Sequence, residues 1–399
     1  MTQIVIVGAG PTGAALSLLF VKRGICVVLI EAAKDFQRVF RGEGLMPSGL
    51  NALQQMGLSP LLESVPHRSL TGWEFILNGK QLFRVDEPMG AEQPCTLVSQ
   101  PPLLSALIAE AQTYAEFELI SGIAVKNLLR KGDRVAGVIL SDGQEISANL
   151  VIGADGRNSL VRQRAGLELI CQPKSIDVLW FKLAAHPRFI EDNVFTTIVN
   201  GDRVFSIFHG AAEGKLHLAW VITADQRTDD KQANWAEIFA ALSPSWLAEH
   251  FHTYADTIES PIRLSVIVGR CPRWYAPGIL LLGDAAHPMS PVRAQGINLA
   301  LRDVIVATNH LVSVLHASAT DAEIDAVLPN IQAEREPEII RAQSLQLQEA
   351  SQGNILQKNQ FIRRLLILLA PLLRDKIRQS WVKRQQQMRQ GITQVKLTV

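Results

Sequence analysis

Residues 4–31 read IVIVGAGPTGAALSLLFVKRGICVVLIE, which is an apolar run, a glycine-rich turn, a helical pattern and a second apolar run. Three glycines of this turn have separate purposes in a nucleotide-binding βαβ unit. Gly8 permits the tight turn, Gly10 lets the backbone approach a pyrophosphate, and Gly13 lets the helix pack closely on the strand. The spacing predicts a dinucleotide site at the end of the first strand, without separating FAD from NAD.

The residues beside these glycines complete the same site. Pro11 and Thr12 open the predicted helix, and the N–H groups and positive dipole end at a helix N-terminus attract phosphate. Glu31 closes the second strand 18 residues after Gly13, where an acidic side chain can accept hydrogen bonds from both ribose hydroxyls. The alternative is a turn in which the glycines are only structural.

Further apolar runs and helical patterns extend this unit into an α/β fold. Short apolar runs typical of buried parallel strands occur at residues 26–31, 150–153 and 278–282. Apolar residues spaced three and four apart predict helices at residues 11–23, 47–56, 102–114 and 296–315. Residues 70–85 and 176–222 are instead rich in β-branched and aromatic residues, with turn signals such as Asn78-Gly79. They predict a second sheet.

The order of these segments predicts a discontinuous domain organisation. The nucleotide-binding domain is expected to comprise residues 1–70, 97–175 and 271–340. The second sheet, inserted in two pieces, is expected at residues 71–96 and 176–270 and would bind the substrate. Residues 341–399 form a helical and polar C-terminal region.

Composition and charge argue against several classes of protein. The 39 basic and 38 acidic side chains nearly balance, so no global charge favours binding to nucleic acid. The four cysteines form no C-x-x-C pair, which fits a reducing cytosol better than disulfides or a metal site. No cleavable signal is visible, and the longest apolar run, at 365–373, has nine residues against the ~20 of a spanning helix. We expect a cytoplasmic protein without a bound metal.

Two later segments separate FAD from NAD. Residues 153–162 read GADGRNSLVR, and residues 283–288 read GDAAHP, followed by Pro291, Gly296, Asn298 and Asp303. These segments resemble the Asp-Gly and Gly-Asp motifs of the para-hydroxybenzoate hydroxylase-like (class A) FAD-dependent aromatic monooxygenases. The resemblance implies a Rossmann-like FAD-binding domain with an inserted mixed β-sheet substrate domain, a C-terminal helical region and non-covalently bound FAD.

The resemblance also implies which residues hold the flavin. Gly283 and Asp284 end a strand with a carboxylate that can bind the ribityl hydroxyls, and a turn cap is the alternative role. Gly296, Ile297 and Asn298 begin a helix whose backbone N–H groups can face the pyrimidine edge of the flavin. A positive helix end at that edge stabilises negative charge on the reduced ring.

Three further positions match flavin-binding residues of the family. Arg41 corresponds to an arginine that reaches the pyrophosphate, and Gln100 to a residue that contacts the adenosine or ribityl portion. For both, a solvated loop position is the alternative. Asp155 is expected to support pyrophosphate binding and the nicotinamide route, or else only to stabilise a turn. His287 is expected to support the loop after the Gly-Asp motif, with acid–base catalysis as the alternative.

The sequence departs from the family at two positions. Ala32 follows Glu31 where the family usually has arginine, so one adenosine contact is either absent or made by another residue. Arg293 replaces a common glycine in the loop after the Gly-Asp motif and would place a cation near the flavin or the substrate entrance. In the same loop, Pro291 matches a residue whose backbone carbonyl lies near the site of oxygen transfer.

We expect the substrate to bind between the inserted sheet and the flavin, where aromatic residues alternate along the predicted strands. Candidates for direct contact are Trp180, Phe208, His209, Trp220 and Arg293. An apolar and aromatic lining suits a planar or lipophilic ligand. For the side chains on the strands, packing within the core of the sheet is the alternative.

The resemblance implies a catalytic cycle with two co-substrates. NADH or NADPH would reduce FAD transiently, O2 would add at the flavin C4a position, and the hydroperoxide would hydroxylate or epoxidise a small aromatic or lipophilic compound. Flavin-dependent halogenases and reductases share the first motif, but the halogenase run W-x-W-x-I-P is absent from the chain. A non-catalytic flavoprotein is a third alternative. The substrate, the nicotinamide preference and the oligomeric state stay open.

The end of the chain is basic. Residues 361–390 contain eight basic residues and one acidic residue, interleaved with leucine, isoleucine and tryptophan. Such a helix can lie on an anionic membrane or pack against a partner subunit. The alternative is an intramolecular helix that covers the nucleotide-binding domain and turns its basic face to solvent.

Overall fold

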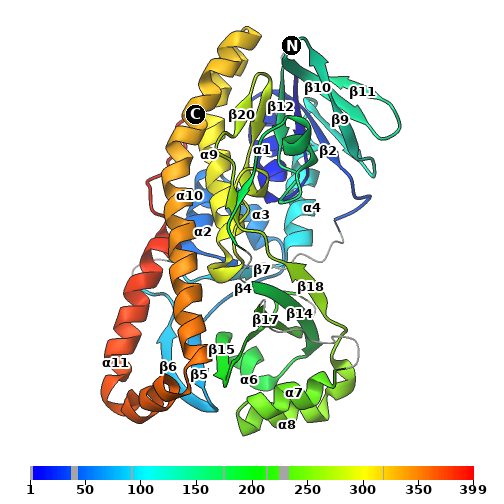
Figure 1. Cartoon of the computed structure of the whole chain (residues 1–399). Helices are drawn as coiled ribbons and strands as arrows, with labels where there is room; N and C mark the ends of the chain where they lie inside the picture. The colour runs from blue at the N-terminus through cyan, green and yellow to red at the C-terminus, as the bar shows by residue number, and fades with distance from the viewer. Residues whose placement is uncertain are drawn as a thin grey trace.

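The computed structural model describes residues 3–36, 44–90, 93–173, 176–212, 214–223, 233–317 and 319–399. Two large sheets lie one above the other, and two long C-terminal helices run along one side of the molecule (Figure 1). The predicted α/β class, with a Rossmann-like domain, an inserted mixed sheet and a C-terminal helical region, is confirmed.

The upper sheet has six strands in the order β20-β21-β12-β1-β2-β8. Its strands are β1 (Gln3–Val7), β2 (Cys26–Glu31), β8 (Phe117–Ser121), β12 (Leu150–Gly153), β20 (Tyr275–Ala276) and β21 (Ile279–Leu281). All neighbours pair in parallel except β20 and β21. The carboxyl ends of β1, β12 and β21 therefore lie at one edge, where a ligand of such a sheet binds.

Both faces of the six-stranded sheet are covered, as the continuous apolar runs require. Ile4 and Ile6 of β1 pack against α1 (Pro11–Val21), α4 (Gln100–Ala111) and α9 (Gln295–His316). Val5 and Val7 point to the opposite face. That face is covered by a three-stranded sheet, absent from the predicted elements, of β9 (Val125–Lys131), β10 (Arg134–Leu140) and β11 (Glu145–Ser147).

The lower sheet has seven strands in the order β18-β14-β17-β16-β15-β5-β6. Its strands are β5 (Gly72–Leu77), β6 (Lys80–Asp86), β14 (Ile176–Ala184), β15 (Val194–Asn200), β16 (Arg203–His209), β17 (Lys215–Thr223) and β18 (Ile262–Ser265). β15 and β5 pair in parallel and the other neighbours are antiparallel, so the sheet is mixed. Helices α7 (Trp235–Leu242) and α8 (Ser245–Thr253) cover one face, and the other face borders a cavity.

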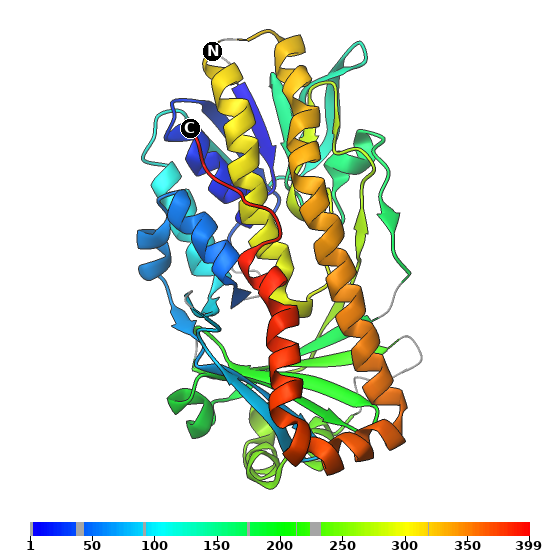
Figure 2. The same ribbon diagram turned by 90° about the vertical axis from the view of Figure 1, so that its left-hand side faces the viewer.

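The C-terminal region consists of two long helices. α10 (Asp321–Lys358) begins with a capping box between Thr320 and Glu323 and passes the expected boundary at residue 340 without interruption. α11 (Gln360–Gln390) turns back and lies against β6 and α10. Figure 2 shows the segment after α11 continuing along α9 toward the nucleotide-binding half. The basic helix thus packs within the chain, and much of its inner face covers the seven-stranded sheet. Contact of its outer face with a membrane or a partner subunit stays a prediction.

Short elements join these parts. The three-stranded sheet β3-β7-β4 comprises β3 (Gly44–Leu45), β7 (Thr96–Val98) and β4 (His67–Ser69), and a ribbon pairs β13 (Ile170–Cys171) with β19 (Gly269–Arg270). The short helices are α2 (Pro47–Gln55), α3 (Ser59–Glu63), α5 (Leu160–Arg164) and α6 (Pro187–Glu191). Among the described residues, no helix combines the length and hydropathy needed to cross a bilayer.

Candidate functional site

The three glycines of the N-terminal turn meet different surroundings. Gly8 has φ +100°, and a Cβ there would lie 2.5 Å from the Ala154 carbonyl oxygen. A Cβ at Gly13 would lie 1.9 Å from the Gly8 oxygen, so a side chain at either position is excluded. At Gly10 a Cβ would meet no atom within 4 Å. The open space beside Gly10 is where a pyrophosphate can approach the backbone.

The beginning of α1 suits an anion. Gly10 is its N-cap residue and provides no side chain to bind the first N–H groups, Pro11 is among the first helical residues, and no acidic residue lies in the first turn. These backbone donors and the positive helix end are therefore available to a phosphate. Thr12 is buried, and a Cβ at Gly283 would lie 2.5 Å from its hydroxyl oxygen. Thr12 of the first motif therefore lies directly against Gly283 of the Gly-Asp turn.

Glu31 lies at the end of β2, as predicted. Its Oε2 accepts a hydrogen bond of 2.9 Å from the Ala9 N–H, and its Oε1 accepts one of 2.9 Å from the Ala33 N–H. These bonds hold the carboxylate beside the glycine turn, which is where such an acidic side chain accepts hydrogen bonds from a ribose. Arg41 lies outside the described residues.

The Gly-Asp turn is shaped by a buried carboxylate of α9. Asp303 Oδ2 accepts hydrogen bonds from the Gly283 N–H at 3.1 Å and from His287 Nε2 at 2.7 Å. Its Oδ1 accepts one from Arg335 Nε at 2.7 Å. Burial acts to raise the pKa of Asp303, but His287 and Arg335 bring that pKa below its ordinary value. His287 is 1% exposed and supports the loop from inside, as expected.

Asp284 differs from Asp303 although both are largely enclosed. It lines the cavity, and no hydrogen bond of the described residues stabilises its charge; only the more distant His287 and Arg157 favour ionisation. Burial is the dominant cause and raises the pKa of Asp284 above its ordinary value. A carboxylate with unused acceptor capacity at a cavity wall suits a ligand with several hydroxyl groups, such as the ribityl chain of FAD.

The Asp-Gly motif makes structural contacts. Asp155 accepts hydrogen bonds from the Ser159 hydroxyl and, at 3.0 Å, from the Val161 N–H at the beginning of α5. Burial raises its pKa, which these bonds partly offset. Arg162 donates to the Ala285 carbonyl at 2.8 Å and thereby joins the Asp-Gly motif to the Gly-Asp turn. These contacts show that Asp155 stabilises the turn, while its role in pyrophosphate binding and in the nicotinamide route stays a prediction.

The beginning of α9 faces the cavity through its backbone. Gly296 and Ile297 line the cavity, and the N-cap Ala294 makes no side-chain cap. The Asn298 side chain is already used, because it accepts from the Met46 N–H at 2.8 Å and donates to the Gly44 carbonyl at 3.1 Å. Asn298 can therefore reach a flavin through its backbone only, while its amide holds β3 in place.

Gln100 and Pro291 also border the cavity. Gln100 is buried at the first position of α4. The Pro291 carbonyl accepts a hydrogen bond of 3.1 Å from the Ala294 N–H, which closes the turn before α9. Both residues are therefore close enough to the cavity to contact a bound flavin or substrate.

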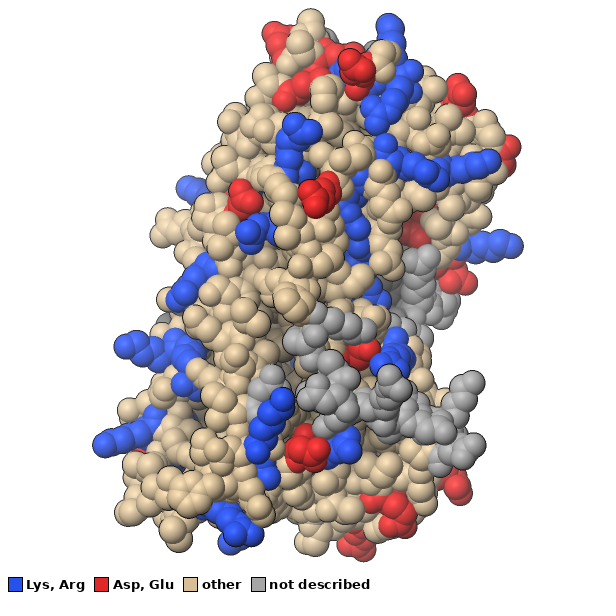
Figure 3. All heavy atoms as spheres, in the orientation of Figure 1, with Lys and Arg blue, Asp and Glu red and all other residues tan. Residues whose placement is uncertain are grey.

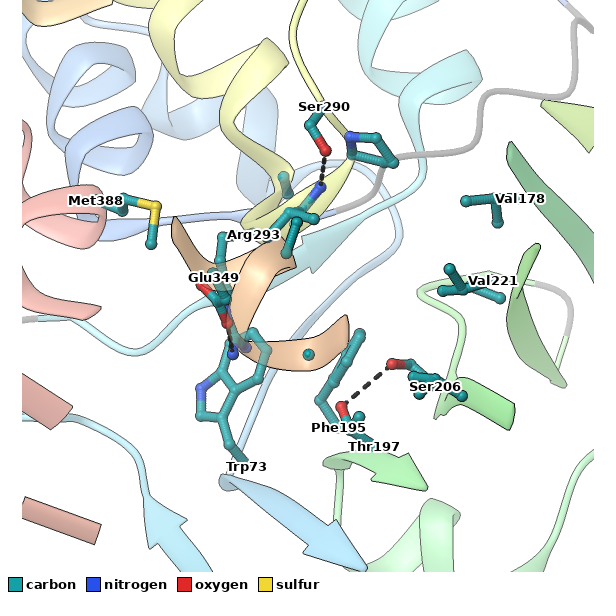
Figure 4. Close-up of a pocket in the computed structure, with 18 of the residues that line it drawn as sticks. Trp73, Val178, Phe195, Thr197, Ser206, Val221, Ser290, Arg293, Glu349 and Met388 are labelled. Atoms are coloured by element: carbon teal, nitrogen blue, oxygen red, sulfur yellow. Dashed lines mark hydrogen bonds and ion pairs between the residues drawn. The ribbon is translucent and has the colours of Figure 1, made fainter. Parts of the chain in front are cut away.

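The cavity has a volume of about 740 Å³ and lies between the seven-stranded sheet, the loop at residues 288–296 and the C-terminal helices (Figure 4). Aromatic side chains of the sheet line it, together with Trp381 of α11: Trp73, Phe75, Phe83, Trp180, Phe195 and Phe208. Phe195 and Phe208 stack with centroids 5.0 Å apart. The Thr197 and Ser206 hydroxyls form a 3.2 Å hydrogen bond within this lining. The cavity is apolar with a few placed polar groups, as ligand sites usually are.

Strand periodicity divides the predicted substrate residues into two sets. Trp180 and Phe208 line the cavity, as does Arg293. The predictions for Trp220 and His209 are wrong. Trp220 packs against Trp235 and Phe239 on the covered face, and His209 lies outside the cavity lining, where its Nδ1 meets the Gly210 carbonyl at 2.7 Å. Alternate residues of a strand point to opposite faces, so an aromatic residue alone does not identify the cavity side.

Arg293 occupies an aromatic cage at the centre of the loop. Its backbone is left-handed, with φ 60° and ψ 26°, which explains why related loops have glycine there. Its guanidinium carbon lies 4.8 Å from the Trp381 ring centroid and 5.2 Å from that of Trp73. Nε and Nη2 both donate to Glu349 of α10, the former at 2.8 Å. The cation predicted near the flavin or the substrate entrance thus lines the cavity, but it is neutralised by a carboxylate that the sequence did not reveal.

Glutamine side chains hold the rest of this loop. Gln346 of α10 donates to the Ser290 carbonyl at 2.9 Å and to the Val292 carbonyl at 2.7 Å. Gln295 donates to the Met388 carbonyl of α11 at 3.0 Å. One glutamine of the C-terminal region therefore satisfies two backbone carbonyls of the loop, and one glutamine at the end of the loop satisfies a carbonyl of α11. The helical spacing of Trp381 and Met388 could have indicated that they lie on one face of a helix. It could not have indicated which part of the protein that face contacts.

Comparisons with known proteins agree with this geometry. Residues 1–337 match the family model described as an FAD binding domain. The chain is 30% identical over 370 residues to a 6-methylpretetramide 4-monooxygenase of Streptomyces rimosus, covering 88% of this chain and 84% of the relative. It is 28% identical over 338 residues to 3-demethoxyubiquinol 3-hydroxylase of Escherichia coli K12, covering 78% and 80%.

Two solved structures show the same fold. p-Nitrophenol 4-monooxygenase PnpA from Pseudomonas putida aligns with a TM-score of 0.79 at 17% identity, covering 99% of this chain and 100% of that chain. PqsL of Pseudomonas aeruginosa in complex with 2-aminobenzoylacetate aligns with a TM-score of 0.75 at 21% identity, covering 90% and 98%. Together with the open glycine turn, the uncapped helix ends and the cavity-facing Asp284, these matches establish that the chain belongs to the FAD-binding flavoprotein monooxygenases.

Proposed function

We propose that this flavoprotein monooxygenase hydroxylates a multi-ring aromatic compound in the cavity beneath the Gly-Asp turn, with NADH or NADPH and O2 as co-substrates. The 740 Å³ cavity carries this proposal, because Asp284 and Gly296 lie on one of its walls and aromatic residues of the seven-stranded sheet on another. A flavin held by the first wall would therefore face a substrate held by the second.

The volume supports a large substrate. A cavity of about 150 Å³ accepts a single benzene ring, so the cavity of about 740 Å³ is several times larger than one ring requires. One relative is named for 6-methylpretetramide, and it covers most of this chain at 30% identity. A fused, polyketide-like aromatic compound fits both observations.

The polar groups of the cavity support an oxygenated substrate. Glu349, whose carboxylate pairs with Arg293, can accept a hydrogen bond from the hydroxyl group of a phenol or enol. A phenol that donates a hydrogen bond to a carboxylate has a more electron-rich ring, which reacts more readily with an electrophilic oxygen. Thr197 and Ser206 provide a second pair of donors and acceptors on the sheet (Figure 4).

The chain's own residues have defined tasks in this proposal. Gly8, Gly10, Pro11, Thr12 and Gly13 bind the pyrophosphate through backbone groups. Other groups complete the flavin site: Glu31 for the ribose, Asp284 after Gly283 for the ribityl chain, Gln100 beside it, and the backbone of Gly296, Ile297 and Asn298 for the ring. Bound FAD would accept a hydride from NADH or NADPH and activate O2. The aromatic walls exclude water, and Pro291 and Arg293 position the substrate.

Turnover with a panel of ring systems tests the proposal. Purified enzyme is mixed with FAD, NADH or NADPH and either single-ring phenols or fused phenolic ring systems, and oxygen uptake and product masses are followed. We expect fused phenols to accelerate nicotinamide oxidation and to gain one atom from isotopically labelled O2. Equal nicotinamide oxidation with and without every aromatic compound, together with no oxygenated product, would contradict it.

A further inference from the structure

The first part of α11 exposes a continuous apolar stripe. Phe361, Leu365, Leu368 and Leu372 are 74%, 43%, 73% and 80% exposed, respectively. Their spacings of four, three and four residues place them on one face of the helix. Large side chains exposed to this degree are ordinary when scattered, but a contiguous stripe of them indicates a contact surface.

The opposite face of α11 is also apolar. Leu366, Ile377 and Trp381 line the cavity and account for the inward face. A helix at the surface of a globular protein usually has one apolar face and one polar face. Packing within this chain explains the inner face of α11, whereas the outer stripe from Phe361 to Leu372 has no use within the described residues.

Basic side chains flank the outer stripe. Arg364, Lys376 and Arg378 of α11 and Lys358 at the end of α10 are all exposed. Asp375 is the sole acidic residue of α11, and it pairs with Arg378 at 3.3 Å. In Figure 3, Lys and Arg side chains project along the edge of the molecule where Figure 1 places α11. The stripe is therefore apolar at its centre and positive around it.

We propose that this stripe docks on the surface of an anionic lipid bilayer. Apolar side chains of an interfacial helix enter the boundary between headgroups and acyl chains, and surrounding lysines and arginines bind anionic headgroups. A second copy of the chain fits less well. A twofold pairing of α11 with its counterpart would bring Arg364 and Lys376 close to the same residues of the other copy, where like charges repel.

The position of the stripe suggests what docking would achieve. This part of the proposal rests on the proposed function. Leu356 of α10 and Leu366 of α11 line the cavity, whereas Ile355 and Leu365, their neighbours in sequence, are exposed. The end of the cavity and the docking stripe therefore lie at the same corner of the molecule. A lipophilic aromatic compound dissolved in the bilayer could enter the cavity there with little exposure to water.

Vesicle flotation of the full-length FAD-loaded protein tests the docking. The probes are vesicles of phosphatidylcholine mixed with phosphatidylglycerol, and vesicles of phosphatidylcholine alone. We expect binding to the anionic vesicles, weakened by salt, and about tenfold weaker binding for Leu372→Glu and for the pair Arg364→Glu, Lys376→Glu. Ile170→Glu, at a residue 57% exposed in β13, is the matched control and should bind as the unmodified protein does.

The outcomes distinguish docking on a bilayer from nonspecific adsorption and from pairing of two copies. Binding that is equal on both vesicle types, or that Ile170→Glu weakens as much as Leu372→Glu, would overturn the proposal. A dimer in solution that Leu372→Glu dissociates would identify the stripe as a subunit interface and would also overturn it. Because flotation requires no turnover, failure of the proposed oxygenation leaves this result intact, and retained FAD absorbance reports that each variant is folded.

Discussion

Arg293 and Glu349 form an ion pair that joins the loop after the Gly-Asp turn to α10. The pair lies in a cage of Trp73 and Trp381, and the side chain of Arg293 is only 10% exposed. The loop that borders the flavin site is thus connected to the helices that close the substrate cavity. Changes on either side of this connection should therefore affect both flavin binding and substrate binding.

Replacing Arg293 by glycine removes the charged side chain and keeps the left-handed backbone conformation that the loop needs at this position. Glycine adopts the left-handed conformation without strain, but it removes the ion pair with Glu349 and the packing against Trp73 and Trp381, so we expect a lower unfolding temperature. Loss of a charge-assisted contact of about 1.5–3 kcal/mol should raise KM for a phenolic substrate by roughly tenfold or more. Steady-state kinetics and thermal unfolding measure the two effects, and Arg293→Lys serves as the control that keeps the charge. An unchanged KM in the glycine variant would remove Arg293 from substrate binding.

Asp284→Asn should have opposite effects on the apoprotein and on flavin binding. Because burial raises the pKa of Asp284, its ionised form destabilises the folded apoprotein at neutral pH. The asparagine variant should therefore unfold at a higher temperature at pH 7, and this gain should disappear as pH falls below about 4, where the wild-type carboxyl is neutral in both states. FAD affinity should fall, as titration of the apoprotein can show. Equal FAD affinity would exclude the ribityl role.

Asp303→Asn tests the buried network behind the Gly-Asp turn. Removing this charge leaves Arg335 buried without one of its two carboxylate partners. Such a loss typically lowers the free energy of unfolding by about 3–5 kcal/mol. Since the pKa of Asp303 is lowered in the folded state, its stabilising contribution is present above about pH 4 and is lost as pH falls through the folded-state pKa. The wild type and Asp303→Asn should therefore differ less in their free energies of unfolding, measured with urea, as the solution becomes more acidic. The exposed pair His310–Glu334 provides a control, because Glu334→Gln should cost less than about 1 kcal/mol.

Gln346→Ala should loosen the loop without unfolding the protein. The Ser290 and Val292 carbonyls each lose a donor, at a cost of about 1 kcal/mol per bond. We expect more hydrogen peroxide per nicotinamide oxidised, because a mobile loop admits water to the reacting centre. Gln386→Ala, at an exposed position of α11, is the comparison. If both variants release the same amount of peroxide as the wild type, the glutamine contacts have no effect on coupling.

Val221→Phe tests the size of the substrate. Val221 lies on the cavity face of β17, so the larger ring would project into the space proposed for a fused ring system. Activity with fused phenols should decline while activity with any accepted single-ring compound persists. Val221→Ala is the matched control that enlarges the space. Parallel loss of both activities, with normal FAD content, would show that the cavity does not select by size.

The local sequence predicted the flavin half of this protein well, because each requirement there is imposed by backbone geometry. Gly13 cannot carry a side chain next to the Gly8 carbonyl, and this constraint acts within a short βαβ unit. The continuous apolar runs likewise indicated strands that are buried on both faces. Such signals are readable from the chain because neighbours in sequence create them.

The roles of individual side chains depended on contacts between distant segments. Trp220 and Phe208 are both aromatic residues of the seven-stranded sheet, yet one packs against α7 and the other lines the cavity, because strand direction and register set which face each side chain occupies. Glu349 and Trp381 reach Arg293 only because α10 and α11 fold back over the sheet. The chain sequence thus determined the cofactor class, whereas tertiary packing decided which residues surround the substrate, since side chains from separate elements form that surface only after they pack together.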